Sequence, residues 1–221
     1  MLKDPLTLGL YSPVQGANRK NDNLEFANDI VSIKQVDDES TRFISKGGHG
    51  NVFFKTDTNT VIKLANKSCD KKNLNNEARI LNDLRSLNCV VRKLDSEDTN
   101  ILALEYIDGF DLSELEKKLS SALLSKKIHI DEYLNSILYL DKELLRSIHS
   151  VNLAGYSHND IKPSNIMYDK NWQGLKLIDF GEATSIGSAY CSGHEAYASP
   201  EGLSNMGRND KFNADTSVDS W

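Results

Sequence analysis

Two polar clusters joined by a predicted β-hairpin constrain the fold of this chain more than any other feature. The first cluster reads "SHNDIKPSN" at residues 157–165 and contains Asp160, Lys162 and Asn165. Two short apolar pieces, "IMYD" and "LKLIDF", follow on either side of the turn "KNWQG". Short apolar pieces around a glycine-containing turn predict a small hairpin. The second piece runs into Asp179, which marks the second polar cluster. We therefore expect the hairpin to present its two ends, with the polar residues of both clusters, at a cleft.

These polar residue types suit the transfer of a phosphoryl group. Asp160 would accept or orient the proton of a substrate hydroxyl, and Lys162 would neutralise charge that develops on the transferred group. Asn165 and Asp179 would ligate magnesium through their side-chain oxygens. Gly181 would let the chain turn sharply after Asp179. Each of these signals is weak when it is taken singly.

The first half of the chain predicts a sheet with one helix. Residues 41–65 alternate short apolar runs with turn residues, as in three antiparallel strands. The stretch "NLNNEARILNDLRSL" at residues 73–87 places apolar side chains at helical spacing, which indicates an amphipathic helix. Residues 89–109 predict two further strands. We therefore expect a five-strand antiparallel sheet that carries one helix.

A glycine cluster, a strand lysine and a helix glutamate follow one another in this half. The cluster "GGHGNV" contains Gly47, Gly48 and Gly50, whose backbone N–H groups could approach a phosphate. Lys63 lies in a predicted strand, and Glu77 lies fourteen positions later in the predicted helix. Taken alone, the features are most simply a tight turn, a solvent-facing lysine and a solvated glutamate. Their order, however, is the arrangement that holds a lysine against nucleotide phosphates.

The rest of the chain predicts a second lobe and a polar leader. Residues 108–221 read as a mainly helical lobe, in which Gly155 ends a long helix. Residues 39–107 would form the sheet lobe, and the polar, aperiodic residues 1–38 a loosely ordered leader. The hydrophobic fraction of 39% in 221 residues is enough for a packed core.

Composition also excludes several classes of partner. A formal net charge of −6 argues against nucleic acid as the main partner. No apolar run reaches the about 18 residues that a membrane span needs. The three cysteines match neither a disulfide framework nor a zinc site and are expected to be reduced thiols. We therefore expect a soluble, cytosolic protein that binds neither nucleic acid nor membrane.

The ordered set of motifs resembles the eukaryotic-type protein kinase superfamily over residues 43–221. In order, these motifs are "GGHGNV", "VIK", Glu77, "HNDIKPSN", "DFG" and "SPE". "HNDIKPSN" keeps four residues of the family's H-R-D-x-K-x-x-N motif, and "DFG" is intact at residues 179–181. The resemblance implies an α+β, bilobal kinase-like fold with a truncated C-lobe. It also implies ATP and Mg²⁺ as cofactors, with Mn²⁺ as an alternative metal.

The resemblance further assigns the nucleotide contacts. "LALEYIDG" would be the hinge between the lobes, where backbone groups of Glu105 and Ile107 bind adenine and Asp111 lies near the ribose. Val52 and Met167 would lie on either side of the adenine. Other positions carried over are Leu104 as gatekeeper and Leu81, His158 and Phe180 in the family's regulatory stack.

Two features of the resemblance favour a protein substrate. "GHEAYASPE" is similar to the family's G-T-x-x-Y-x-A-P-E block, which small-molecule kinases of the aminoglycoside and choline type lack. Lys162, two residues after Asp160, is also absent from those enzymes and points to serine or threonine rather than tyrosine. Two alternatives stay open: a pseudokinase that serves only as a binding module, and a small-molecule kinase.

Several positions depart from the family pattern. Ser45 stands at the first glycine of the loop, His49 at its tip, and Val61 where a small alanine is usual. Asn159 replaces the arginine that in many kinases pairs with an activation-loop phosphate, and His194 replaces a threonine that contacts the catalytic loop. We therefore expect no activation through a phosphate at that arginine position.

The end of the chain and its leader indicate which group within the kinase superfamily the sequence resembles. The "DSW" at residues 219–221 looks like the D-x-W that opens the large central helix of the second lobe, so nearly all that follows in the family is missing. The sequence is then either a fragment or a naturally reduced kinase that closes its lobe differently. Reduced kinases with polar leaders occur among the proteins that bacteria inject into host cells. This sequence resembles that group, and within it the HopBF family of type III effectors. That resemblance implies secretion into the host cytosol and a eukaryotic heat-shock chaperone as the protein substrate. We also expect the protein to be a monomer.

Overall fold

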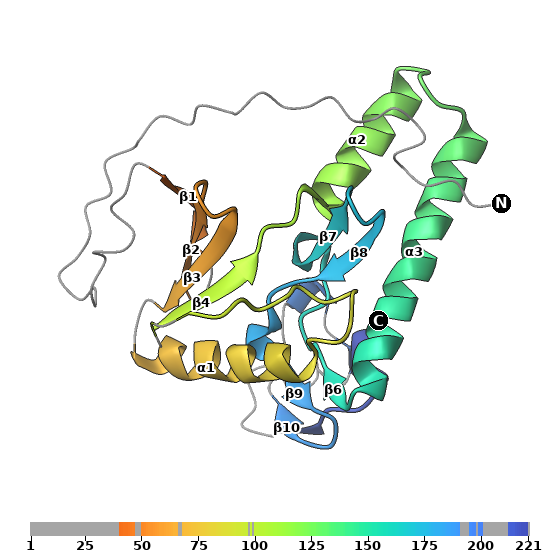
Figure 1. The fold of residues 1–221 in the computed structure, drawn as a ribbon. Coiled ribbons are helices and arrows are strands. Elements are labelled where there is room, and N and C mark those ends of the chain that lie inside the picture. The colour runs from red at the N-terminus through yellow and green to blue at the C-terminus, as the bar shows by residue number, and fades with distance from the viewer. Residues whose placement is uncertain are drawn as a thin grey trace.

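The computed structural model describes a four-stranded sheet with one helix beside it, joined to a second group of helices and short strands (Figure 1). The described residues are 40–46, 50–65, 68–96, 98, 100–190, 195–197, 199–200 and 212–220. The predicted leader, residues 1–38, lies outside them. No helix in these ranges is long and apolar enough to cross a membrane.

The sheet contains β1 (Thr41–Lys46), β2 (Gly50–Lys55), β3 (Thr60–Ala65) and β4 (Ile101–Glu105). The strands follow this order, and each neighbouring pair is antiparallel. The three strands predicted within residues 41–65 are therefore confirmed. In β3 the buried Lys63 is paired with Val52 on one side and Leu102 on the other, so the lysine lies in the middle of the sheet.

The expected fifth strand is wrong: the sheet has four strands in the described part of the chain. The segment before β4 divides its backbone hydrogen bonds between two sheets. The N–H of Leu94 donates to the carbonyl of Ala103 in β4 at 2.8 Å, whereas the N–H of Val91 donates to Leu177 of the second half at 3.0 Å. A segment shared in this way forms isolated bridges rather than a strand, and it ties the two halves together.

Helix α1 (Ser68–Asp83) lies beside the sheet, where the sequence predicted a helix, but it begins five residues earlier than expected. Its apolar side packs inward, and Leu74, Ile80 and Leu81 are buried. The helix contacts β3 and β4 on one side and the short 3-10 helix η4 (Phe180–Glu182) on the other. Through these contacts α1 connects the sheet to the segment that follows Asp179.

The second half contains two long helices, drawn on the right of Figure 1. They are α2 (Leu112–Leu124) and α3 (Ile130–Leu153). Helix α2 is capped by Asp111, whose Oδ1 accepts a hydrogen bond from the N–H of Glu114 at 2.8 Å. Helix α3 ends at Leu153 with Ala154 as its C-cap, and Gly155 follows with a φ of 88°. Glycine adopts this left-handed conformation without strain, so Gly155 ends the helix as the sequence predicted.

The predicted hairpin is confirmed as β7 (Ile166–Asp169) and β8 (Gly174–Leu177), which pair in antiparallel register. With β5 (Gly109–Asp111) they form a three-stranded sheet. The N–H of Ile178 donates to the carbonyl of Asn165 at 2.9 Å at the open end of the hairpin. The two polar clusters of the sequence therefore meet at one edge of this sheet.

Short elements fasten the remaining segments. Strand β6 (Tyr156–Ser157) pairs with β9 (Thr184–Ser185), and β10 (Ala189–Tyr190) pairs with β11 (Phe212–Asn213). Three further 3-10 helices are η3 (Pro163–Asn165), η5 (Glu195–Tyr197) and η6 (Val218–Ser220). A single large hydrophobic core contains residues from α1, β4, α2, α3 and β8, so the two halves share a core.

Candidate active site

A buried lysine and two carboxylates join the two halves of the molecule. Lys63 Nζ lies 2.7 Å from Glu77 Oε2 on α1 and 2.5 Å from Asp179 Oδ1, which follows β8. Lys63 and Glu77 are buried, whereas the Asp179 side chain keeps 42% of its surface exposed. The predicted pair of Lys63 and Glu77 is present, and the structure adds Asp179 to it. A partly exposed carboxylate beside a buried cation is accessible to a ligand.

The three charges shift one another's pKa values. Burial favours the neutral amine of Lys63, but the carboxylates of Glu77 and Asp179 outweigh it and raise the pKa of this lysine. Burial raises the pKa of Glu77, although Lys63 partly opposes that effect. Burial would also raise the pKa of Asp179, but the ammonium of Lys63 lowers it. At neutral pH the lysine and Asp179 are therefore held in their charged forms.

The first polar cluster converges on Asp160. Lys162 Nζ lies 2.7 Å from Asp160 Oδ2. Asn165 Nδ2 donates to Asp160 Oδ2 at 2.8 Å and to the Asp160 carbonyl at 2.9 Å. Both of these side-chain hydrogen bonds of Asn165 use the amide nitrogen, so the amide oxygen is the side-chain atom left for a metal. The structure thus brings together the three residues that the sequence singled out.

The loop that carries Asp160 is packed directly against the segment that carries Asp179. Phe180 is fully buried, and its ring centroid lies 4.6 Å from that of His158. His158 Nε2 is 3.0 Å from the carbonyl of Ile178. Leu81 of α1 is fully buried in the same core cluster as Phe180. The residues of the expected stack therefore lie in one core, and Asp179 takes a left-handed conformation with a φ of 61°.

Asp219 is a buried acceptor whose role the sequence did not reveal. Its Oδ2 accepts from the N–H of His158 at 2.6 Å, and its Oδ1 accepts from the N–H of Asn159 at 2.7 Å. The Ser157 hydroxyl also lies 3.0 Å from Oδ2. The sequence marked Asp219 only as part of a D-x-W motif. The contact joins residues about sixty positions apart, so no local pattern could have found it.

Helix α1 is held to the second half by polar contacts of Asn76, Arg79 and Asp83. Asn76 Nδ2 donates to the carbonyl of Ala183 at 3.2 Å. The Tyr156 hydroxyl donates to Asp83 Oδ2 at 2.6 Å, at the other end of the helix. Glu77 lies between these two contacts along the chain, so they help to keep its carboxylate on Lys63.

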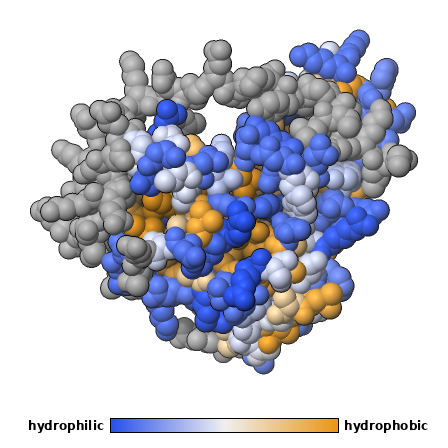
Figure 2. Space-filling model, viewed as in Figure 1, coloured by the Kyte–Doolittle hydropathy of each residue, from blue (hydrophilic) through white to orange (hydrophobic). Residues whose placement is uncertain are grey.

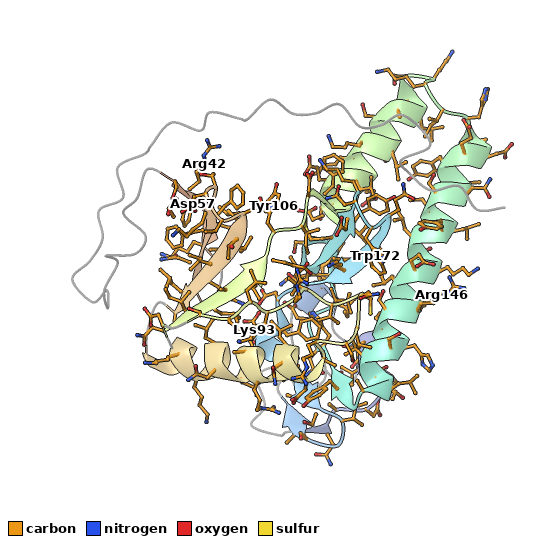
Figure 3. The ribbon with its side chains drawn as sticks, in the orientation of Figure 1. Arg42, Asp57, Lys93, Tyr106, Arg146 and Trp172 are labelled. Atoms are coloured by element: carbon orange, nitrogen blue, oxygen red, sulfur yellow. The ribbon has the colours of Figure 1, made fainter. Side chains whose placement is uncertain are left out.

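The predicted hinge is the connection from β4 to β5. Glu105 at the end of β4 forms an ion pair with Lys176 Nζ at 2.5 Å, and its N–H donates to the carbonyl of Arg92 at 2.9 Å. Ile107 is buried, whereas Tyr106 between them is partly exposed and its ring lies against Phe54 (Figure 3). Figure 2 shows apolar surface between the sheet and the helices α2 and α3, in the middle of this face. Contacts of Glu105 and Ile107 with adenine stay a prediction.

Three more predicted nucleotide contacts lie in the described residues around this connection. Asp111 is the α2 cap, half-buried, and its assignment to the ribose stays a prediction. Val52 on β2 is paired with Lys63, and Met167 on β7 is paired with Asp111. Both side chains are half-buried, and they belong to the two different halves. Their contact with adenine stays a prediction.

Only one of the three predicted loop glycines can be placed. A Cβ on Gly50 would lie 2.4 Å from the carbonyl oxygen of Leu64, so the close approach of β2 and β3 requires glycine here. Gly47 and Gly48, like His49, lie outside the described residues. Gly50 therefore has a packing role, and its contact with a phosphate stays a prediction.

The donor atoms suit a magnesium ion that is shared with a phosphate ligand. Within the described ranges, no group of three or more His, Cys, Asp or Glu residues could hold a metal alone. Magnesium usually binds through one or two protein oxygens and completes its shell with water and substrate phosphates. Asp179 offers an open carboxylate and Asn165 an amide oxygen, so this pair fits such an ion, and Lys63 offers a cation for the phosphates.

Comparison with known proteins supplies the family. The family model described as protein kinase domain matches residues 14–221. Mouse serine/threonine-protein kinase SBK1 is 29% identical over 195 residues, which are 83% of this chain and 44% of that protein. Human citron Rho-interacting kinase is 35% identical over 126 residues, 54% of this chain and 6% of that protein.

A bacterial protein is also similar. Protein kinase YpkA of Yersinia pseudotuberculosis is 29% identical over 111 residues, which are 50% of this chain and 15% of that protein. The chain thus spans less than half the length of each of these curated relatives.

Proposed function

This chain belongs to the protein kinase family, and on that premise we propose that it is an active serine/threonine kinase. It would transfer the γ-phosphoryl group of ATP, with Mg²⁺, to a hydroxyl of a protein substrate. The observation that supports activity most directly is the joining of Lys63 to both Glu77 and Asp179 beside the Asp160 cluster. A chain that only bound partners would have no need to keep these charges together.

Each polar residue has a role that its position supports. Lys63, held by Glu77, would bind the α- and β-phosphates of ATP. Asp179 and the amide oxygen of Asn165 would hold Mg²⁺, which offsets phosphate charge when it is bound. Because the cations and carboxylates are already placed, they need little reorganisation when the transition state forms.

The transfer step follows from the position of Asp160. Its carboxylate would orient the substrate hydroxyl and take up its proton as the hydroxyl oxygen bonds to the γ-phosphorus. The bond from that phosphorus to the bridging oxygen of ADP breaks, and the electron pair leaves with ADP. Lys162 lies 2.7 Å from Asp160 and would stabilise the charge of the transferred group. Phosphoserine or phosphothreonine and ADP would be the products.

A finer proposal concerns where the kinase acts. We propose that it is a secreted bacterial effector that modifies a host protein, and that the substrate is a eukaryotic heat-shock chaperone. The support is the resemblance of the sequence to the HopBF family, together with the similarity to a Yersinia protein kinase. We also propose that it acts as a monomer.

The test is phosphate transfer with a matched pair of variants. Wild-type protein, Asp179→Ala and Asp57→Ala would be incubated with labelled ATP and Mg²⁺ in eukaryotic lysate. Asp57, labelled in Figure 3, lies in the turn between β2 and β3, beyond the last strand pair of Lys55 and Thr60, and serves as the control. We expect labelled phosphoserine or phosphothreonine with wild type and Asp57→Ala, and loss of more than about 100-fold with Asp179→Ala.

Other outcomes of this experiment identify the alternatives. ATP binding without any labelled product would indicate a pseudokinase. Labelled sugar or aminoglycoside without labelled protein would indicate a small-molecule kinase. Equal labelling by wild type and Asp179→Ala would refute the assignment of the site. A labelled chaperone band that Asp179→Ala fails to produce would support the effector proposal.

A further inference from the structure

Asn159 connects the catalytic loop to the segment that follows Asp179. Its Nδ2 donates to the carbonyl of Glu182 at 2.9 Å and to Thr184 Oγ1 at 3.0 Å. Asn159 directly precedes Asp160, and Glu182 comes three residues after Asp179. The amide therefore joins the residue before the proposed base to a residue three positions after the proposed metal ligand.

The orientation of this amide follows from its partners. The Glu182 carbonyl can only accept a hydrogen bond, so it must face the amide nitrogen. On the other side, Asn159 Oδ1 lies 2.7 Å from the Ser157 hydroxyl, which can donate to it. Asn159 is only 7% exposed. Both ends of the buried amide are thus satisfied by residues of the same site.

The backbone at this position also suits asparagine. Asn159 has a φ of 63°, a left-handed conformation that asparagine adopts more readily than most residues other than glycine. Its N–H is fixed by Asp219 at 2.7 Å, so the backbone and the side chain are both held. Strand β9, which contains Thr184, is paired with β6 just before Asn159. The amide thus reinforces a short two-residue pairing.

We propose that Asn159 is a positioning residue that fastens β9 to the catalytic loop through neutral hydrogen bonds to Glu182 and Thr184. This inference rests on the proposed kinase function and deepens it. The contact fixes Asp160 relative to Asp179 without any added charge, because an amide, a carbonyl and a hydroxyl make it. A phosphate on the segment is then unnecessary for assembly of the site.

The variants follow from the two bonds. Asn159→Gly removes the amide and keeps the left-handed backbone free of strain. Thr184→Val removes one acceptor at nearly constant shape, and Thr184→Ser restores the hydroxyl. Ser188→Ala is the matched control, because the Ser188 side chain is exposed and, among the described residues, no hydrogen bond of its hydroxyl is found.

The first measurement separates kcat from KM. With one hydrogen bond lost, we expect Thr184→Val to lower kcat about fivefold, and Asn159→Gly about thirtyfold. KM for ATP should stay within about twofold in both variants, since neither bond reaches the proposed nucleotide contacts. Thr184→Ser and Ser188→Ala should match wild type. The double variant Asn159→Gly/Thr184→Val should be no slower than Asn159→Gly, because Thr184 acts only through Asn159.

The second measurement needs no catalysis. Hydrogen exchange of the amides at residues 184–186 should be about tenfold faster in Asn159→Gly and unchanged in Ser188→Ala. If the wild type transfers no phosphate at all, the proposed function fails, and the exchange result alone decides whether the contact exists. Unchanged exchange in Asn159→Gly, additive losses in the double variant, or equal rates for Thr184→Val and wild type would each overturn the proposal.

Discussion

Replacing Asp219 should destabilise the protein strongly, although this residue touches none of the proposed reacting groups. The Asp219 carboxylate is 5% exposed and accepts hydrogen bonds from the backbone N–H groups of His158 and Asn159. In Asp219→Ala both N–H groups stay buried without an acceptor. Each such group costs about 1–3 kcal/mol, so we expect the free energy of unfolding to fall by about 2–6 kcal/mol.

A second variant should lower the free energy of unfolding by a smaller amount. In Asp219→Asn, the amide oxygen can stand at the Oδ2 position and keep the contacts to His158 and Ser157. The amide nitrogen then faces the N–H of Asn159, so one donor loses its acceptor. We expect a loss of about 1–3 kcal/mol, smaller than that of Asp219→Ala.

Urea unfolding followed by circular dichroism measures both losses. Asp215→Ala is the control, because Asp215 belongs to the same segment but is exposed, and its Oδ1 accepts from the nearby Ser217. We expect Asp215→Ala to lose less than about 1 kcal/mol. If Asp219→Ala unfolded within about 0.5 kcal/mol of wild type, the hydrogen bonds of Asp219 would not carry the stability assigned to them.

Two further predictions concern Gly50 in the sheet and Asp179 in its contact with Lys63. Gly50→Ala should lower the free energy of unfolding in urea by about 1–3 kcal/mol and raise KM for ATP, because the new Cβ would push against the Leu64 carbonyl. Asn51→Ala is the control. Equal stability of the two variants would contradict the packing argument. The effect of Lys63 on Asp179 is larger than that of burial, so the pKa of Asp179 is lower in the folded protein than its ordinary value of 3.8. The ionised carboxylate therefore stabilises the fold above pH 3.8. This contribution is lost as the pH falls through the pKa of Asp179 in the folded protein. The difference in Tm between wild type and Asp179→Asn should therefore shrink as pH falls below 3.8, and a difference that grew would be inconsistent with the lowered pKa.

Local patterns predicted the elements that stand alone along the chain. The apolar pieces around "KNWQG" gave the hairpin of β7 and β8, because alternation and a turn are properties of a few consecutive residues. The same reasoning failed at residues 89–95, where a strand was expected. That segment bonds to β4 and to β8 at once, and a sequence pattern cannot show how a backbone divides its partners.

In the site, too, the sequence predicted some features and the tertiary structure decided others. Order and residue type were enough to select Lys63, Glu77, Asp160, Asn165 and Asp179, since phosphate chemistry demands those groups. The sequence could not show that Lys63 contacts both Glu77 and Asp179 at once, because that contact depends on how α1 packs against the segment after β8.

The sequence by itself thus determined the family, the hairpin and the identity of the polar groups, because these depend on residue types and short spacings. Only the tertiary structure decided how the groups are held. Asp219 reaches the catalytic loop from about sixty residues away, and Asn159 reaches Glu182 and Thr184 across the gap between two segments. Hydrogen bonds act over about 3 Å in space and are indifferent to separation along the chain, so contacts of this kind appear only after folding.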